Sequence, residues 1–345
     1  MSKILLALSG GVDSSVAGEL LKERGHDLVA AFLTHPALDP EPAYQAARDL
    51  GVDLVVEDIS RQLERIVFPA FERAYASGHT PNPCVLCNPT VKFAALLSTA
   101  DRLGCDQIAT GHYARVEKCS TWNNSPALLK ALSPNDQSYM LCRLTPDILA
   151  RCVFPLGEFR SKEEVRAYAA SRGISAADRP DSMEICFIPD GDYAAWLRAR
   201  GVSDSPGDFV DADGSPLGRH RGILGYTVGM RRGLGVSANE RLYVKHIDPT
   251  TNRITLVKEN DMYTQGVRLS DLRQVSIPFD RLPDRVTVKL RHSTREYPAS
   301  LVVDPPFGEG STATLTLDKA VRIPAPGQFA AIYLGDILAA SGVIL

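Results

Sequence analysis

Residues 6–15 read LALSGGVDSS, and the rest of the chain is organised around them. An apolar run over 4–8 comes before the glycines and an amphipathic stretch over 14–21 comes after them, which predicts a strand, a tight turn and a helix. Gly10 and Gly11 allow backbone conformations that other residues avoid, so main-chain N–H groups can approach an anion beside the helix N-terminus. The stretch therefore predicts a phosphate-binding turn, although the two glycines alone are equally consistent with a turn that only caps a helix.

Hydroxyl groups and one carboxylate complete this turn. Ser9, Ser14 and Ser15 are donors, whereas Asp13 would repel phosphate unless a cation lay between them, so Asp13 predicts a bridging Mg²⁺ ion. The string SGGVDSS resembles the PP-loop of the ATP pyrophosphatase superfamily, whose members transfer AMP to a carbonyl oxygen and release pyrophosphate. No Gly-Lys-Ser/Thr follows, so the turn is not a Walker A loop.

Composition limits the class of protein. The 345 residues are 44% hydrophobic, which predicts two or three domains with sizeable cores. No apolar run is long enough for a membrane span and the first residues are typical of a core strand, so we expect a cytoplasmic protein without a membrane partner. Seven cysteines at irregular spacing then indicate free thiols.

The charge of the chain is unevenly distributed. The net charge is −3, but residues 1–214 carry a net −8 and residues 215–345 a net +5. The basic part could face a polyanion such as a nucleic acid. An excess of this size is also ordinary scatter, so charge alone decides nothing.

The N-terminal half alternates between strand and helix patterns. Strands over 28–33 and 54–57 with a helix over 42–50 between them predict a parallel sheet that binds ligands at the C-terminal ends of its strands. Prolines and glycine predict a rigid, irregular loop over 77–89. The further expected segments are helices over 61–76 and 90–103, a strand over 107–110, a short strand over 127–132, a helical stretch over 136–144 and a helix capped by Ser161 and ending near Arg172.

The C-terminal part has a different pattern. Beyond residue 261, short apolar runs are separated by turn residues, which predicts a small antiparallel β-barrel. The five expected strands cover residues 286–290, 299–303, 313–317, 329–334 and 337–343.

The cysteines fall into two groups. Four lie in or beside helical or apolar patterns and are expected to be buried and inert, namely Cys105, Cys119, Cys142 and Cys152. Cys84, Cys87 and Cys186 lie in loop-like settings. Cys87 comes just before an expected helix start at Pro89, with Lys92 near in sequence, and both features favour a thiolate. Cys87 is therefore the best candidate nucleophile.

Metal binding is an alternative use of these thiols. The pair Cys84 and Cys87 could be half of a zinc site, but no second C-x-x-C or H-x-x-x-H motif follows. Three thiolates, from Cys84, Cys87 and Cys186, could hold a [4Fe–4S] cluster with one iron left open.

The order of the motifs identifies a family. The chain resembles the tRNA-specific 2-thiouridylases of the MnmA type from residue 4 to its C-terminus. The resemblance rests on SGGVDSS (9–15), TPNPCVLCN (80–88) followed by VKF (91–93), ATGHYAR (109–115), DQSYML (136–141), DSMEICFI (181–188), GYTVGMRRGLG (225–235) and PGQFA (326–330). It implies an α/β PP-loop domain of the adenine nucleotide alpha hydrolase type with a parallel sheet (1–200), a small central tRNA-binding domain (201–262) and a C-terminal antiparallel β-barrel (263–345).

The resemblance also implies site residues. The ATP-binding positions would be Ala7, Leu8, Ser9, Gly10, Gly11, Val12, Asp13, Ser14, Leu33 and Gly111. The target base would meet Asn82, Pro83 and Cys84. Other tRNA contacts would come from His112, Asp136, Gln137 and Ser138, and from the barrel residues Arg291, His292 and Gln328.

The implied reaction is ATP-dependent 2-thiolation of the wobble uridine, U34, of tRNA. Adenylation of O2 would be followed by sulfur transfer, with Cys186 carrying a persulfide and Cys87 attacking or resolving it to leave a Cys87–Cys186 disulfide. A cysteine desulfurase or a sulfur-relay protein would supply the sulfur. Relatives often have Asp at the position of Cys84, which keeps the cluster alternative open. A PP-loop ligase acting on a small molecule and a non-catalytic tRNA-binding module are the rival functions.

Overall fold

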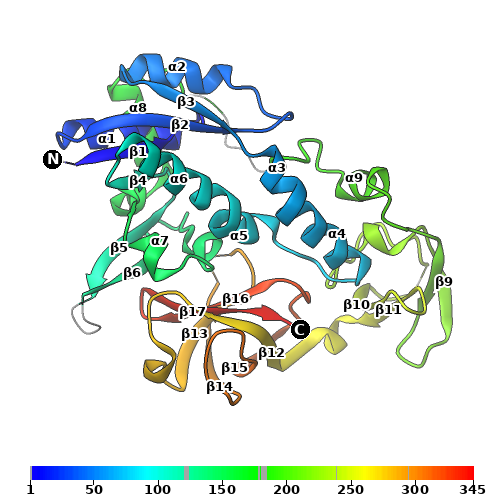
Figure 1. Cartoon of the computed structure of the whole chain (residues 1–345). Coiled ribbons are helices and arrows are strands. Elements are labelled where there is room, and N and C mark those ends of the chain that lie inside the picture. The colour runs from blue at the N-terminus through cyan, green and yellow to red at the C-terminus, as the bar shows by residue number, and fades with distance from the viewer. Residues whose placement is uncertain (1, 120–123, 178, 180–184, 238, 294) are drawn as a thin grey trace.

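The computed structural model describes residues 2–119, 124–177, 179, 185–237, 239–293 and 295–345. Their strands form a parallel sheet, a four-stranded sheet and an antiparallel barrel. In Figure 1 the parallel sheet (blue to cyan) lies above the barrel (orange and red), and the four-stranded sheet lies to one side of both. None of the helices in the described part of the chain combines the length and apolar composition needed to cross a membrane.

The parallel sheet carries the strand order β3-β2-β1-β4-β7, so β1 is central. Its strands are β1 (Lys3–Ala7), β2 (Asp27–Thr34), β3 (Leu54–Asp58), β4 (Gln107–Ala109) and β7 (Cys152–Val153). Alternate residues of β1 enter different cores: Ile4 and Leu6 pack with one cluster, and Leu5 packs with the other. Because both faces are covered, the central strand β1 is apolar after Lys3, as buried parallel strands usually are, whereas the edge strand β3 ends in Glu57 and Asp58.

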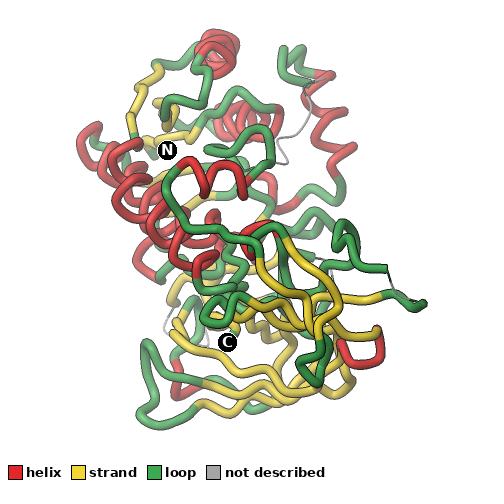
Figure 2. Tube along the Cα trace, turned by 90° about the vertical axis from the view of Figure 1, so that its right-hand side faces the viewer, coloured by secondary structure: helices red, strands yellow, loops and turns green. Residues whose placement is uncertain are grey.

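Helices cover the two faces. One core contains apolar residues of α1 (Val12–Glu23), α2 (Glu41–Leu50) and α8 (Lys162–Ser171). The opposite core contains residues of α6 (Phe93–Leu103) and continues into the barrel through Phe329, Tyr333 and Leu338. Figure 2 shows most of the helices gathered around the parallel sheet, whereas strands fill the barrel end. The predicted strand and helix alternation is confirmed.

The predicted loop over 77–89 is wrong in its second half. A helical segment starts at Pro83 and runs through α5 (Pro83–Cys87) and a π-turn, η2 (Asn88–Lys92), into α6. Asn82 caps it by accepting a hydrogen bond from the Val85 N–H at 3.3 Å. Pro83 occupies the first helical position, where a missing N–H costs nothing. The prolines therefore mark a helix start instead of preventing one.

A long helical segment precedes this one. The predicted helix over 61–76 is divided into α3 (Ser60–Gln62), a π-turn η1 (Leu63–Val67) and α4 (Phe68–Ala76). Its aromatic side chains share a core with α9 (Tyr193–Ala199) and the four-stranded sheet. That sheet has the order β10-β11-β8-β9 and consists of β8 (Gly207–Val210), β9 (Pro216–His220), β10 (Leu242–Asp248) and β11 (Arg253–Lys258).

The C-terminal barrel closes through six strands, because β12 pairs with both β15 and β17. The five expected strands are confirmed as β13 (Arg285–Lys289), β14 (Tyr297–Val303), β15 (Ala313–Arg322), β16 (Phe329–Leu334) and β17 (Ile337–Ile344). The sixth, β12 (Tyr263–Gln274), was not expected from the sequence. Asp271 has a left-handed φ of 47° at a register shift, which interrupts the alternation on which a strand prediction depends.

A hairpin connects the domain of the parallel sheet to the C-terminal barrel. β5 (Ala114–Cys119) pairs with β6 (Ser125–Lys130), and β6 pairs with the barrel strand β17 through Leu129 and Ile337. The short strand expected over 127–132 is therefore present, shifted toward its N-terminus. The helical stretch expected over 136–144 is only a single 3₁₀ turn. The remaining short helices are η4 (Ser138–Leu141), α7 (Pro146–Leu149), η5 (Pro155–Glu158), η6 (Ile223–Gly225), η7 (Glu259–Met262) and η8 (Phe279–Arg281).

Candidate active site

The glycines of the PP-loop are required by the packing around them. Gly10 has φ of 79°, and a Cβ atom there would lie 2.3 Å from the carbonyl carbon of Pro42. Gly111, which follows β4, packs against the same turn, because its Cβ would lie 2.8 Å from the Asp13 carbonyl carbon. The turn thus lies at the C-terminal edge of the sheet with Gly111 beside it, as predicted.

The serines of the turn divide into two roles. The hydroxyls of Ser14 and Ser15 donate to the Gly11 carbonyl at 3.0 and 3.1 Å, and both side chains are buried. Ser9 is exposed, and its hydroxyl lies 3.2 Å from that of Ser14. The buried hydroxyls therefore hold the shape of the turn, and Ser9 is the serine at the surface of the site.

Asp13 is held by two residues from distant parts of the chain. Lys162 Nζ lies 2.8 and 2.7 Å from the two carboxylate oxygens, and the Tyr113 hydroxyl donates to Oδ1 at 2.7 Å. Lys162 is placed by the Ser161 cap, whose Oγ accepts from the Glu164 N–H at 3.2 Å. The lysine compensates the charge of Asp13 in this structure, while the role of Asp13 toward Mg²⁺ remains a prediction.

Sequence reasoning missed two groups at the PP-loop. They are Lys162 and Arg179, whose guanidinium donates to the Gly10 carbonyl at 2.8 Å. More than 90 residues separate each of them from its partner, so no local pattern could have linked them to the loop. The only signal was the position of Lys162 directly after the recognised helix cap.

The other predicted nucleotide positions lie at the same edge of the sheet. Ala7 ends β1, and the Leu8 N–H donates to the Ala31 carbonyl at 2.9 Å, which continues the β1–β2 pairing toward the turn. Leu33 is half-buried near the end of β2, opposite Glu57 of β3. Leu8 and Val12 are buried.

The three loop thiols form one cluster. Cys84 and Cys87 lie in α5, and Cys186 is exposed beyond Asp181–Glu184, which lie outside the described residues. The pKa of Cys87 is raised to about 11, mainly by burial; the charge of Lys92 lowers it, and the charges of Cys186 and Cys84 contribute smaller increases. Burial also raises the pKa of Cys84 and of Cys186.

These values correct the prediction of a thiolate at Cys87. The helix starts at Pro83 instead of Pro89, so Cys87 lies inside the helical segment and Cys84 lies in its first turn. The Lys92 charge acts as expected, but loss of solvation outweighs it. Cys87 is therefore mainly a neutral thiol at pH 7.

Three of the four remaining cysteines are buried, as predicted. Cys105, Cys142 and Cys152 are buried, and burial raises the pKa of each thiol. Cys119 is only half-buried, on β5. Within the described ranges, no group of three or more His, Cys, Asp or Glu side chains is placed to hold a metal ion. The structure thus supports neither the zinc site nor the [4Fe–4S] cluster.

His112 lies between the PP-loop and the thiols. It follows Gly111, its Nδ1 is 2.6 Å from the Thr110 hydroxyl, and its ring lies 6.0 Å from Phe93 and 6.1 Å from Phe154. Burial, and then the charge of Lys92, hold the pKa of His112 well below its usual value. His112 is therefore neutral. The charge of Lys92 also favours the thiolate form of Cys84, Cys87 and Cys186, so the same lysine influences His112 and the three thiols.

The D-Q-S motif forms a domain junction. Asp136 pairs with Lys289 of the barrel at 2.7 Å, with side chains 9% and 4% exposed. The Ser138 hydroxyl donates to Asp136 at 2.9 Å, lies 3.0 Å from the Tyr333 hydroxyl and has no exposed surface. In this structure the polar groups of Asp136 and Ser138 are taken by protein partners, and their contact with tRNA stays a prediction.

Gln137 connects the same junction to the PP-loop. Its Oε1 accepts from the Tyr113 N–H at 3.1 Å, and its own N–H donates to the Tyr113 carbonyl at 2.8 Å. Since the Tyr113 hydroxyl reaches Asp13, hydrogen bonds run from this motif to the PP-loop.

A barrel loop lies against the segment that leads to the thiols. Gln328 Nε2 donates to the Thr80 carbonyl at 2.8 Å, and the Thr80 N–H donates to the Pro326 carbonyl at 2.7 Å. Arg291 and His292 are exposed just beyond β13. Partial burial of the His292 ring, and then the charge of Lys289, lower the pKa of His292. The structure thus places Gln328 beside residues 80–82, and Arg291 and His292 on the barrel surface.

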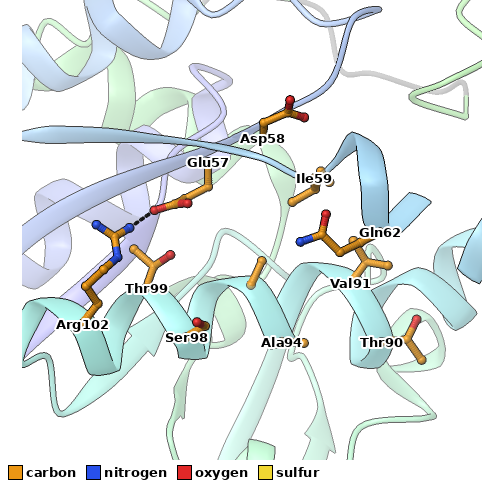
Figure 3. Close-up of a pocket in the computed structure, with 11 residues that line it drawn as sticks. Glu57, Asp58, Ile59, Gln62, Thr90, Val91, Ala94, Ser98, Thr99 and Arg102 are labelled. Atoms are coloured by element: carbon orange, nitrogen blue, oxygen red, sulfur yellow. Dashed lines mark hydrogen bonds and ion pairs between the residues drawn. The ribbon is translucent and has the colours of Figure 1, made fainter. Parts of the chain in front are cut away.

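A separate cavity of about 240 Å³ lies between the end of β3 and α6. Figure 3 shows a mixed polar and apolar lining, in which Glu57 of β3 pairs with Arg102 of α6 at one end and Gln62 of α3 lies toward the other. None of the residues that line it belongs to the predicted nucleotide, thiol or tRNA positions.

Comparisons with known proteins cover the whole chain. Three family models match in order: the tRNA methyl transferase HUP domain over 2–190, the tRNA methyl transferase PRC-barrel domain over 198–258 and the aminomethyltransferase beta-barrel domain over 264–344. The tRNA-specific 2-thiouridylase MnmA of Roseiflexus sp. (strain RS-1) is 38% identical over 375 residues, which cover 100% of this chain and 99% of the relative. That of Syntrophomonas wolfei subsp. wolfei is 39% identical and covers 99% of both chains. With its full length matched at this identity, the chain belongs to the family of tRNA-specific 2-thiouridylases.

Proposed function

We propose that this chain is an ATP-dependent sulfurtransferase of the cytoplasm that converts the wobble uridine of tRNA to 2-thiouridine. The observation that carries the proposal is the joint placement of a PP-loop and a cluster of free thiols at one edge of the parallel sheet. Gly111 packs on Asp13, and His112 is the next residue after Gly111. The charge of Lys92 lowers the pKa of both His112 and Cys87. Family membership supports the same substrate.

The first half of the reaction uses the PP-loop. ATP transfers AMP to O2 of the uridine and pyrophosphate leaves, which makes C2 open to attack by sulfur. In this proposal residues 9–14 would hold the phosphates, and Leu33 and Gly111 would border the adenosine. A Mg²⁺ ion between Asp13 and the pyrophosphate would neutralise charge, and the Asp13 carboxylate at the turn fits such an ion once Lys162 releases it.

The second half uses two thiols. Cys186 is exposed, so a cysteine desulfurase or a sulfur-relay protein can load it with a persulfide. The Cys87 thiolate attacks the Cys186 sulfur, a disulfide forms, and the released hydrosulfide displaces AMP from C2. Because burial raises the pKa of Cys87 to about 11, we expect this step to accelerate as the pH rises above 7.

The tRNA contacts we propose surround these groups. Asn82, Pro83 and Cys84 begin the helix that carries the thiols and would meet the target base. His112, Gln137 and Gln328 lie at the edge of the same region, and Arg291 and His292 offer the barrel surface to the anticodon arm. We propose that Asp136 and Ser138 act indirectly, by joining the barrel to the PP-loop domain.

Nucleoside mass spectrometry tests the function. Unmodified tRNA is incubated with the protein, Mg-ATP and a persulfide donor, beside Cys87→Ser and Cys186→Ser variants purified without oxygen. We expect 2-thiouridine that requires both cysteines from a colourless protein. Brown protein whose activity also requires Cys84 would establish the [4Fe–4S] route instead. If no preparation forms 2-thiouridine, a PP-loop ligase for a small molecule becomes the better assignment.

A further inference from the structure

The proposed reaction uses two thiols, but the structure gathers three. Cys84 and Cys87 are three residues apart in α5, so their side chains lie on one side of the helical segment. Three residues of helix separate Cα atoms by about 5 Å, within the range of roughly 4.4–6.8 Å that a disulfide requires. All three cysteines are free. The C-x-x-C pair can therefore close a disulfide with only a local adjustment of the first helical turn.

Residues on both sides of Cys186 pack with Cys87. Cys87 and Ile185 lie against the same apolar cluster, which contains Phe187. Once a Cys87–Cys186 disulfide has formed, its Cys87 sulfur lies within one helical turn of Cys84.

We propose that Cys84 is a resolving thiol that exchanges with the Cys87–Cys186 disulfide and returns Cys186 to its free form. This inference rests on the proposed function, because that disulfide is its substrate. The Cys84 thiol loses its proton and attacks the Cys87 sulfur. The Cys87–Cys186 bond breaks, a Cys84–Cys87 bond forms, and Cys186 leaves as a thiolate that takes up a proton. No net oxidation occurs, and an external thiol later reduces the Cys84–Cys87 disulfide.

The exchange would free Cys186, the most exposed of the three thiols, for a new round of sulfur loading. Cys186 is the exposed member of the cluster, whereas Cys84 and Cys87 are half-buried, so a sulfur donor can reach Cys186 best. A disulfide at Cys186 blocks its loading with new sulfur. Moving the disulfide to the C-x-x-C pair frees Cys186 while the helix keeps the oxidised pair together. Pairs with this spacing are common in proteins that exchange thiols and disulfides.

Mapping of disulfides after one round of reaction tests the exchange. The full-length protein is loaded with persulfide and mixed with Mg-ATP and unmodified tRNA, then quenched with acid and an alkylating reagent. Peptides are analysed without reduction, beside Cys84→Ser and a Cys119→Ser control that removes a half-buried thiol on β5. We expect a Cys84–Cys87 disulfide and alkylated Cys186 in the wild-type and control proteins. Cys84→Ser should instead retain a Cys87–Cys186 disulfide.

The outcomes separate the exchange from the function on which it rests. If wild-type protein makes 2-thiouridine but retains Cys87–Cys186 with alkylated Cys84, the exchange is overturned and the function stands. If wild-type protein makes no 2-thiouridine, the function fails, and equilibration of Cys186→Ser with reduced and oxidised glutathione decides the rest. If the Cys186→Ser protein forms a Cys84–Cys87 disulfide, the result supports these two cysteines as a redox pair. If Cys84 and Cys87 are both alkylated at every ratio of reduced to oxidised glutathione, the redox pair is overturned.

Discussion

At the level of single residues, the carboxylate of Asp13 shows how the site is prepared before any ligand binds. Its two oxygens receive hydrogen bonds from Lys162, at the start of α8, and from Tyr113, just before β5. The Tyr113 main chain is itself fixed by two hydrogen bonds with Gln137, one to the Gln137 side-chain Oε1 and one from the Gln137 main-chain N–H. The tyrosine therefore sets the direction of the carboxylate, while the lysine compensates its charge.

We expect Tyr113→Phe to slow tRNA-dependent AMP formation. A hydrogen bond to a charged group contributes about 1.5 kcal/mol or more, so its removal corresponds to roughly tenfold in rate. The effect should fall on kcat and on the Mg²⁺ dependence more than on tRNA affinity, and Asp13→Ala should abolish AMP formation. Release of AMP from labelled ATP at varied Mg²⁺ measures both.

Tyr139→Phe is the matched control for this change. The Tyr139 hydroxyl is also buried, but it donates to the Phe329 carbonyl at 3.0 Å, away from Asp13. The Tyr139→Phe protein should therefore be less stable than wild type, while the Mg²⁺ dependence of its AMP formation stays unchanged. Equal kinetic effects of the two substitutions would show that Tyr113 has only a structural role.

At the level of elements, the junction between hairpin and barrel contains a buried ion pair. Lys289 of β13 meets Asp136, which follows β6, and the carboxylate also accepts from the Ala131 and Ser138 N–H groups, each at 3.1 Å. Because both charges are withdrawn from water, each depends on the other. The pair thus ties the position of the barrel to the motif that contacts Tyr113.

Removing one partner should cost much more than removing both charges. We expect Lys289→Met to lower the free energy of unfolding by about 3–5 kcal/mol, because it leaves a buried carboxylate uncompensated. Lys289→Met combined with Asp136→Asn should recover most of that stability, since the amide still accepts hydrogen bonds. Urea denaturation of the three proteins measures the differences.

An exposed pair provides the comparison. Arg285 and Asp318 form a two-bond pair on the barrel surface, with side chains 60% and 44% exposed. Arg285→Met should leave the free energy of unfolding almost unchanged, because solvent screens this pair. The junction would not depend on the buried pair if Lys289→Met were no more destabilising than Arg285→Met.

At the level of the whole molecule, the distribution of charge separates the parts of the chain. The acidic part, residues 1–214, contains the nucleotide and thiol groups, whereas the basic part, 215–345, contains most of the four-stranded sheet and the barrel. Arg231 and Arg232 are exposed in the segment between β9 and β10. A polyanion such as tRNA should be held mainly by this basic part.

Arg231→Glu with Arg232→Glu should weaken tRNA binding and flatten its dependence on salt. For every phosphate that is no longer neutralised by an arginine, the slope of log K against log salt concentration should fall by about 0.9 or less. Filter binding over a range of salt concentrations measures the slope. Arg24→Glu with Arg48→Glu is the control, because it changes the net charge equally in the acidic part. Superimposable curves for both double variants would show that residues 231–232 do not face tRNA.

Patterns within a few residues were enough to predict much of this protein. Alternation and turn residues predicted the central parallel strands and five barrel strands, and the glycines of residues 9–15 predicted the turn at the sheet edge. Ser161 predicted a helix cap in the same way. These features depend on backbone sterics, hydrogen bonding and periodic burial, all of which act between near neighbours in the chain.

Tertiary structure decided the features that depend on distant segments. The lysine partners of Asp13 and Asp136 lie 149 and 153 residues away, so no local pattern could reveal them. The bulge at Asp271 interrupts the alternation of β12, so the sequence pattern did not predict this strand. Pairing with β17 joins the hairpin β5–β6 to the barrel. The protonation of Cys87 also required the folded chain, because a pKa depends on how many atoms of other segments displace water around the thiol.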